Sequence, residues 1–234
     1  MNSAVLQSLP ESARQSSERA AVDAWLGKLS GALAGRDRAG IASLFTPDSH
    51  WRDLVAFTWY VTPHRGADAI AASMTQRQEN VQARDFAVDE DRTAPRRVVR
   101  AGIELIEAIL RFETTVGRCH GVLRLLASDP TRAFQLMTGL NALKGFEEKV
   151  GKRRPTGEAY SRNFGGTNWK EQREADQTYA DRDPTVLIVG GGQAGLSFAA
   201  VLGRLGVDAL IVDRLPRVGD CWRTRYHSLA LHND

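Results

Sequence analysis

The sequence has few of the features that mark secreted, membrane or nucleic-acid-binding proteins. Its only two cysteines, Cys119 and Cys221, are too few for a disulfide framework, so we expect a reducing, cytoplasmic environment. No apolar run approaches the roughly 20 residues that a membrane span needs. The N-terminal stretch lacks the basic start and apolar core of a signal peptide. A net charge of +3, from 31 basic and 28 acidic residues, is too small to indicate a nucleic-acid partner.

The composition is that of an ordinary folded protein. Hydrophobic residues make up 42% and charged residues 25%, which excludes a disordered or collagen-like chain. A length of 234 residues is enough for two modest domains. We predict no metal site, because the adjacent Cys119 and His120 lie on an expected strand and point to opposite faces.

The clearest motif lies in residues 184–213. An uncharged run over 185–189 leads into Gly190-x-Gly192-x-x-Gly195, and a helix-patterned segment then leads to a second apolar run that ends at Asp213. This order predicts a strand, a tight glycine turn, a helix and a second strand. Gly190 allows the sharp turn, Gly192 allows the backbone to approach a pyrophosphate, and Gly195 allows the helix to pack closely on the sheet.

The same segment predicts a dinucleotide site, since a helix start presents free N–H groups and a positive dipole end to phosphates. Asp213 can accept hydrogen bonds from ribose hydroxyls, and Arg214 beside it would suit a 2′-phosphate. The fingerprint alone fits both flavin and nicotinamide cofactors. The residues expected at the pyrophosphate are Gly190, Gly191, Gly192, Gln193, Ala194 and Gly195.

The residues after Asp213 resemble the flavin-containing monooxygenase superfamily. Asp213 is followed by the basic Arg214 and, after four more residues, by Gly219-Asp-Cys-Trp222, which has the spacing of the family's Gly-Gly-x-Trp stretch. The continuation, Tyr-x-x-Leu-x-Leu-His over 226–232, is most similar to the plant YUCCA-type enzymes and their bacterial relatives. The resemblance covers about the last fifty residues of the chain.

Three departures from the family pattern stand out. Asp220 occupies the place of a second glycine, and Asp213 replaces the commoner glutamate. Where animal-type members carry an asparagine near the flavin, this chain has His232, with Asn233 one place later. That asparagine's role is therefore assigned to neither residue.

The resemblance implies an FAD- and NADPH-dependent monooxygenase, in which NADPH reduces FAD and O2 then oxygenates a small organic substrate. It implies that Gly219 and Trp222 lie along the flavin and that the NADPH site lies beyond Asp234. Because a doubly wound fold needs five or six strands and only two can be placed after residue 183, we expect an incomplete domain that does not turn over alone. No catalytic residue is assigned.

The first 145 residues change from a helical period to a period of two. One apolar helix face is expected at Val22, Trp25, Leu26, Leu29 and Leu33. A short second helix capped by Asp37, a turn over 46–48, a strand over 57–61 and a helix over 66–81 follow. From Arg84 onward apolar residues alternate with charged ones, as in Ile106, Ala108, Leu110 and Phe112. This predicts an antiparallel sheet with helices on one side.

This order, with the phrase Leu-Phe-Thr-Pro-Asp-Ser-His-Trp over 44–51 and the following Arg52-Asp53, resembles the NTF2-like (SnoaL-like) proteins. The resemblance implies an α+β cone of helices on a curved antiparallel sheet, followed here by the first βαβ unit of an incomplete Rossmann-type domain. It also implies a possible homodimer. The expected division is an N-terminal extension over 1–16, a cone over 17–145, a linker over 146–183 and a partial FAD-binding domain over 184–234.

Two alternatives concern the cone. His50, Trp51, Asp53, Trp59 and Tyr60 could line its mouth, where a carboxylate beside aromatic rings would suit proton abstraction. We favour the simpler interpretation, in which the two tryptophans belong to the core and Arg52 pairs locally with Asp53. At the level of function, the alternatives to a monooxygenase are a ligand-binding or dimerisation module and a non-oxygenating FAD-dependent NAD(P)H reductase. The reductase would normally carry a CxxC pair, which is absent here.

Overall fold

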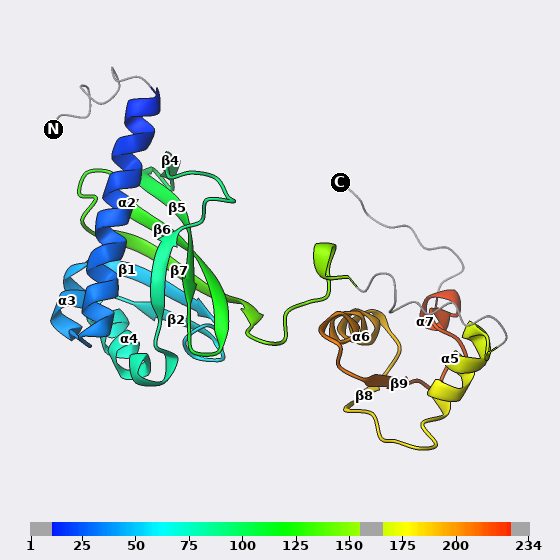
Figure 1. The fold of residues 1–234 in the computed structure, drawn as a ribbon. Coiled ribbons are helices and arrows are strands. Elements are labelled where there is room, and N and C mark those ends of the chain that lie inside the picture. Colours follow the sequence, from blue (N-terminus) through cyan, green and yellow to red (C-terminus); the bar gives the residue numbers. More distant parts are fainter. Residues whose placement is uncertain (1–10, 155–165, 226–234) are drawn as a thin grey trace. The chain divides into compact units, whose positions relative to one another are not determined.

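The computed structural model describes residues 11–154 and 166–225, and the chain divides into two compact units, Met1–Gly145 and Phe146–Asp234 (Figure 1). The first unit contains α2 (Glu11–Ala34), α3 (Arg38–Ser43), β1 (Phe45–Leu54), β2 (Val61–Arg65), α4 (Ala67–Val81), β3 (Arg84–Val88), β4 (Arg96–Arg100), β5 (Ile103–Glu113), β6 (Gly117–Leu126) and β7 (Ala133–Leu143). The second contains η1 (Gly151–Arg153), α5 (Trp169–Thr178), β8 (Val186–Val189), α6 (Gln193–Leu205), β9 (Ala209–Val212) and α7 (Asp220–Arg223).

Helix α2 presents the apolar face that its sequence predicts. Val22, Trp25, Leu26, Leu29 and Leu33 are all at most 2% exposed. The Trp25 indole donates a hydrogen bond of 3.0 Å to the carbonyl of Leu44, which ties this helix to the start of β1. The helix begins at Glu11, so it takes up part of the stretch that was expected to be an N-terminal extension.

Helices α3 and α4 also follow the prediction, but the turn predicted after α3 does not. Asp37 caps α3 by accepting a hydrogen bond of 2.9 Å from the Gly40 amide, and α4 buries Ile70 and Met74. The predicted turn over 46–48 is wrong, because these residues belong to β1. Pro47 is tolerated there since the register of β1 with β7 is irregular between Phe45 and His50.

The strands of the first unit form one sheet in the order β2-β1-β7-β6-β5-β3, with β4 also paired to β5. Helices α2, α3 and α4 pack against one face of this curved sheet, which confirms the α+β cone (Figure 1). The sheet is mixed rather than antiparallel throughout, because β1 runs parallel to β7. The strand β4 was not predicted; its sequence, Arg-Arg-Val-Val-Arg, does not show the alternation of apolar and charged residues on which the other strands were predicted.

The core of the cone is filled by side chains from alternate strand positions. Ile106, Ala108, Leu110 and Phe112 of β5 are all buried, as their period of two predicts. Aromatic rings fill the space beneath the helices: Trp51 contacts Phe57 edge to face, with ring centroids 5.2 Å apart, and Phe112 stacks on Phe86 at 4.7 Å. The part of the interior around these rings is therefore filled by side chains rather than hollow.

The predicted strand over 57–61 is wrong, since only Val61 belongs to a strand. The residues just before Val61 form a loop, which the buried carboxylate of Asp53 holds in place. Its Oδ2 atom accepts hydrogen bonds from the Phe57 amide (3.0 Å) and from the Thr58 amide (2.8 Å) and hydroxyl (2.7 Å). Three donors converging on one oxygen bend the chain away from an extended path, although its residues are strong strand formers.

In the second unit, β8, α6 and β9 form the predicted strand-helix-strand motif. The two strands pair in parallel, with Val186 opposite Ala209 and Val189 opposite Val212. Leu202 of α6 is buried, and Gly206 caps the C-terminal end of the helix with a φ of +75°, the left-handed conformation expected there. None of the helices that the structure describes is both long and apolar enough to cross a membrane.

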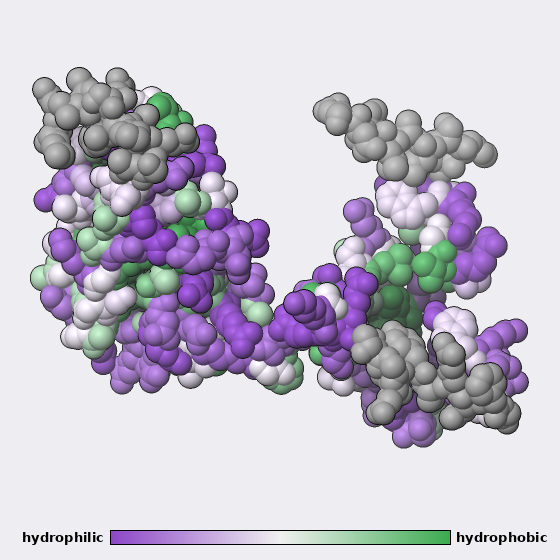
Figure 2. Space-filling view, turned by 45° about the horizontal axis from the view of Figure 1, so that its top comes forward, coloured by the Kyte–Doolittle hydropathy of each residue, from purple (hydrophilic) through white to green (hydrophobic). Residues whose placement is uncertain are grey.

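One face of this small sheet is left largely exposed by the part of the unit that the structure describes. Ile188 is buried beneath α6, but its neighbour Val189 points the other way and is 84% exposed. Figure 2 shows strongly hydrophobic residues at the surface of this unit, whereas the visible face of the first unit is mainly hydrophilic. The exposed apolar side chains of its two strands are Leu187, Val189 and Val212.

Candidate nucleotide-binding site

The glycine turn after β8 has the geometry that its sequence predicts. Gly190 has a φ of +109°, a conformation that residues with a side chain rarely adopt, and its amide donates a 2.8 Å hydrogen bond to the Val212 carbonyl. A Cβ atom on Gly195 would overlap the carbonyl oxygen of Gly190 and lie 3.3 Å from Ile188 Cγ2. Only glycine at 195 therefore lets α6 start this close to the turn.

Asp213 lies directly against this turn. Its Oδ2 atom accepts a hydrogen bond of 2.6 Å from the Gly191 amide, and its Oδ1 atom accepts one of 2.7 Å from the Leu215 amide. The hydrogen bonds from Leu215 and Gly191 lower the pKa of the Asp213 carboxyl. The structure thus holds an ionised carboxylate at the end of β9, within contact of the glycine turn.

Asp213 lines two cavities. One, of about 510 Å³, is lined by Val189, Gly190, Val212, Asp213 and Arg214. The other, of about 370 Å³, is lined by Gly191, Leu196, Ile211, Val212, Asp213, Leu215, Pro216, Arg217, Val218 and Cys221. Of the residues expected to bind a cofactor, the structure brings together Gly190, Gly191, Asp213 and Arg214.

The other expected residues lie beside these cavities. Gly192 is the N-cap of α6, where Gln193, Ala194 and Gly195 form the first turn. Leu196, Leu215, Pro216 and Val218 supply most of the apolar lining of the smaller cavity but were not among the predicted site residues. For Leu215, Pro216 and Val218, the signal that could have found them is the apolar character of the short segment between Asp213 and Gly219.

The segment that carries the monooxygenase resemblance forms a short turn and helix. Gly219 has a φ of +84° and precedes α7, in which Trp222 is partly exposed. Asp220, which replaces the family's second glycine, is only 4% exposed and forms ion pairs with Arg223 (2.8 Å) and Arg217 (3.2 Å). These contacts, that with Arg223 first, lower the pKa of Asp220. The aspartate at this position therefore adds two ion pairs that hold the turn together.

The rest of the motif, 226–232, and the neighbouring Asn233 lie outside the described residues. His232 and Asn233 thus receive no structural account.

The residues present fit the ADP half of a dinucleotide. A backbone without side chains at 190–192 permits close approach, the start of α6 supplies N–H donors, and Asp213 supplies an acceptor for hydroxyl groups. In the structure the Gly191 amide is already bound by Asp213. A ribose would therefore bind the remaining lone pairs of this carboxylate or displace that amide.

The two cysteines carry no metal chemistry that the structure reveals. Cys119 faces the core of the cone, and burial raises the pKa of its thiol to about 11, whereas His120 occupies the other face of β6. Among the residues that the structure describes, no three His, Cys, Asp or Glu side chains group to hold a metal ion.

The residues considered for the mouth of the cone do not converge. Trp51 belongs to the core as expected, but Trp59 is 58% exposed, so its placement in the core is wrong. Asp53 does not pair with Arg52, because strand alternation sends these two side chains to opposite faces of β1. Beyond the loop donors, Asp53 accepts a 2.8 Å hydrogen bond from the Thr138 hydroxyl, which in turn accepts one of 2.9 Å from the Trp51 indole.

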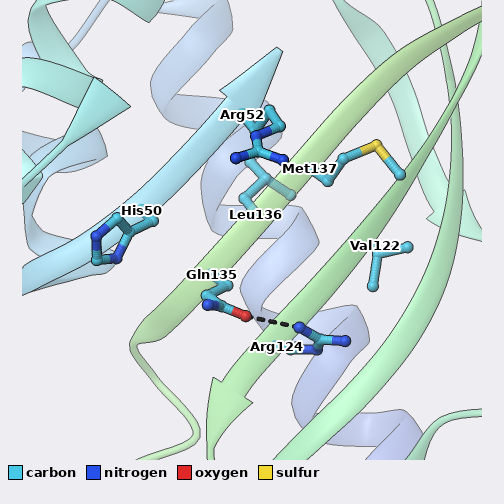
Figure 3. Close-up of a pocket in the computed structure, with 7 residues that line it drawn as sticks. All are labelled: His50, Arg52, Val122, Arg124, Gln135, Leu136 and Met137. Atoms are coloured by element: carbon cyan, nitrogen blue, oxygen red, sulfur yellow. Dashed lines mark hydrogen bonds between the residues drawn. The ribbon is translucent and has the colours of Figure 1, made fainter. Parts of the chain in front are cut away.

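His50 and Arg52 lie on the outer face of the sheet. They border an open cavity of about 470 Å³ with Val122, Arg124, Gln135, Leu136 and Met137. Figure 3 shows His50, Arg52 and Gln135 on the side of the sheet that faces away from α2, with Arg124 bound to Gln135 at 2.7 Å. Leu136 belongs to the core on the other side. A base at Asp53 and a substrate at His50 would therefore be separated by the sheet itself.

Comparisons with known proteins bear on the two units separately. Residues 183–226 match the sequence profile of a family described as an FAD binding domain. A search of curated proteins found no match.

Among solved structures, the chain is similar to a domain of unknown function with a cystatin-like fold from Nostoc punctiforme, at 16% identity and a TM-score of 0.41 over 70% of this chain and 95% of that one. It is similar to a steroid delta-isomerase from Pseudomonas aeruginosa, at 21% identity and a TM-score of 0.33 over 54% and 83%. An NTF2-like protein of unknown function from Mesorhizobium loti has 14% identity and a TM-score of 0.34 over 53% and 93%.

Proposed function

We propose that this chain is the N-terminal part of an FAD- and NAD(P)H-dependent monooxygenase, and that residues 184–234 bind the ADP half of FAD. The observation that carries the proposal is the 2.6 Å contact between Asp213 and the Gly191 amide, which sets a strand-end carboxylate against a glycine turn. The family match over 183–226 supports FAD as the dinucleotide. The monooxygenase reaction and NADPH rest on the resemblance of the segment around Gly219 and Trp222.

Each part of the site has a role in this proposal. The amides from Gly190 to Gly195 bind the pyrophosphate, Asp213 binds the ribose, and Gly219 and Trp222 lie on the flavin side. Bound FAD supplies the redox chemistry, while the protein supplies position. The NADPH site belongs to residues beyond Asp234. The division into a cone over 17–145, a linker over 146–183 and a partial FAD-binding domain, and a reducing cytoplasmic location, are part of the same proposal.

Asp213→Ala is expected to weaken FAD binding about ten-fold or more, since a hydrogen bond to a charged group contributes roughly 1.5–3 kcal/mol. Titration of FAD into the 234-residue chain, followed by flavin fluorescence, measures the effect. ADP should lose affinity by a similar factor, because the carboxylate serves the adenosine half of the cofactor.

Asp183→Ala is the matched control, because Asp183 is an exposed carboxylate just before β8 in the same unit. Its FAD affinity should equal that of the unmodified chain. Equal FAD binding by Asp213→Ala would contradict the assignment of the ribose site.

The reaction itself is tested with the complete enzyme. A monooxygenase consumes NADPH and O2 and releases an oxygenated product, whereas a reductase oxidises NADPH without oxygenating a substrate. Oxygen consumption and mass analysis of the product separate these two functions. Oxidation of NADPH with no oxygen atom in any product would favour the reductase.

A further inference from the structure

A second cavity lies in the first unit, at the end of the cone where the β5–β6 hairpin meets α4. Its volume is about 380 Å³, within the range of small-molecule sites. Three segments enclose it: the loop between β1 and β2, the C-terminal half of α4 and the tip of the hairpin. The lining residues are Ala56, Phe57, Trp59, Gln76, Arg77, Asn80, Val81, Thr114, Thr115 and Val116.

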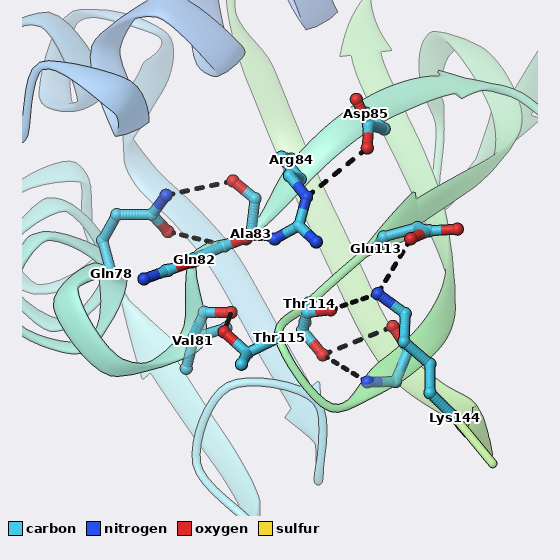
Figure 4. Close-up of polar contacts among 11 residues, drawn as sticks. Gln78, Val81, Gln82, Ala83, Arg84, Asp85, Glu113, Thr114, Thr115 and Lys144 are labelled. Atoms are coloured by element: carbon cyan, nitrogen blue, oxygen red, sulfur yellow. Dashed lines mark hydrogen bonds and ion pairs between the residues drawn. The ribbon is translucent and has the colours of Figure 1, made fainter.

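The wall formed by α4 and the hairpin is held by hydrogen bonds (Figure 4). The Thr115 amide donates to the carbonyl of Val81 at 2.8 Å, and Lys144 Nζ donates to the carbonyl of Thr114 at 2.7 Å. Just past the helix, the Gln78 side chain binds both the carbonyl and the amide of Ala83, at 3.0 and 3.1 Å. The cavity is therefore preformed rather than dependent on a ligand to order its wall.

Arg77 brings an unbalanced positive charge to this cavity. Its Nε atom is buried without a hydrogen-bond partner, and no carboxylate among residues 15–154 and 166–225 forms an ion pair with it. The carboxylate of Asp53, which is buried in the same unit, already accepts hydrogen bonds on both oxygens. A buried guanidinium donor without an acceptor is costly, and a carboxylate would satisfy it through two parallel hydrogen bonds.

The positive charge of Arg77 also affects His64 in the first unit. Burial and then the positive charge of Arg77 lower the pKa of His64, which stacks on Trp51 with ring centroids 4.8 Å apart. An anion beside Arg77 would be well placed to reduce this effect.

An aromatic surface faces the same space. Trp59 is largely exposed, and its φ of +59° is a conformation that a bulky residue rarely adopts. The hydrogen bonds from Phe57 and Thr58 to Asp53 hold the loop that imposes this conformation. Strained residues that a surrounding network holds in place cluster at ligand sites. The Trp59 ring, with Phe57 on the inner wall, suits a flat apolar group.

We propose that this cavity binds a small aromatic carboxylate, with the carboxylate on the guanidinium of Arg77 and the ring against Trp59. All the residues that line the site belong to the first unit. It requires no change in the packed interior around Trp51 and Phe112.

The test uses the 234-residue chain with benzoate, phenylacetate and 2-naphthoate as probes, followed by calorimetry and by NMR of the tryptophan indole signals. At least one probe should bind and shift the Trp59 signal, while its uncharged carboxamide should bind about ten-fold or more weakly. Arg77→Gln should weaken carboxylate binding by a similar factor and remove the preference over the carboxamide. Trp59→Ala should weaken carboxylate and carboxamide alike.

Arg52→Gln is the matched control, since Arg52 is an exposed arginine of the same unit on the outer face of the sheet. Its affinity for the probe should be unchanged. The proposal is overturned if no probe binds at millimolar concentration, if acid and amide bind equally, or if Arg52→Gln rather than Arg77→Gln removes binding. Should Arg77→Gln not fold by circular dichroism, the acid–amide pair and Trp59→Ala still decide the outcome.

Discussion

Gly195→Ala is expected to weaken FAD binding by about ten- to hundred-fold. The added Cβ atom would overlap the Gly190 carbonyl oxygen, so α6 and the glycine turn must move apart. Overpacking of this kind costs roughly 1–3 kcal/mol, which corresponds to that loss of affinity when the phosphate-binding amides are displaced. Titration of FAD into the variant and the unmodified chain gives the ratio of dissociation constants.

Gly203→Ala provides the control within the same helix. A Cβ atom on Gly203 would meet nothing within 4 Å, so alanine should leave FAD binding unchanged. It should also stabilise α6 by about 0.5–1 kcal/mol, because alanine restricts the unfolded chain more than glycine does. Equal FAD affinities for the two variants would show that close packing at Gly195 is not needed for the cofactor.

Asp53→Ala is expected to lower the free energy of unfolding of the cone by about 3 kcal/mol or more, because two buried backbone N–H groups lose their acceptor at roughly 1–3 kcal/mol each. Those groups belong to Phe57 and Thr58, and the Thr138 hydroxyl loses its acceptor as well. Urea denaturation followed by tryptophan fluorescence should show a midpoint lowered by about 1 M or more at a similar slope.

Asp48→Ala is the comparison for this effect. Asp48 lies on the same strand, β1, but is exposed, so the substitution should change the free energy of unfolding by less than about 0.5 kcal/mol. If Asp53→Ala were equally mild, the carboxylate would not be what holds the loop between β1 and β2. The exposure of Trp59 would then need another cause.

The sequence predicted best what local pattern and steric need decide. The face of α2 follows from apolar spacing, and the turn at Gly190 and the cap at Gly206 follow from conformations that favour glycine. Asp213 was expected to bind a ribose, which stays a prediction, and the structure shows that its carboxylate binds the Gly191 amide. This contact could be anticipated only in general terms, since parallel strands bring their carboxyl ends to one edge.

The failures have two other causes, which are hydrogen bonds that override strand propensity and contacts between residues far apart in the chain. The loop between β1 and β2 was predicted as a strand because its residues favour one, but hydrogen bonds to Asp53 decide its shape. No local pattern shows that β1 pairs with β7 in parallel, or that Arg77 and Thr114 line one cavity. Such features depend on which distant segments meet, and alternation alone does not give that partner.

The parallel pairing of β1 with β7 also governs when the cone can form during synthesis. β1 leaves the ribosome early with only the short β2 as a neighbour, and its other edge stays open until the last strand, β7, has emerged. Until then the Trp51 indole has no Thr138 hydroxyl to bind. Pairings this distant in the chain form slowly and leave an unpaired strand edge exposed to other chains. The open edge of β1 is therefore exposed to other chains until β7 has emerged from the ribosome.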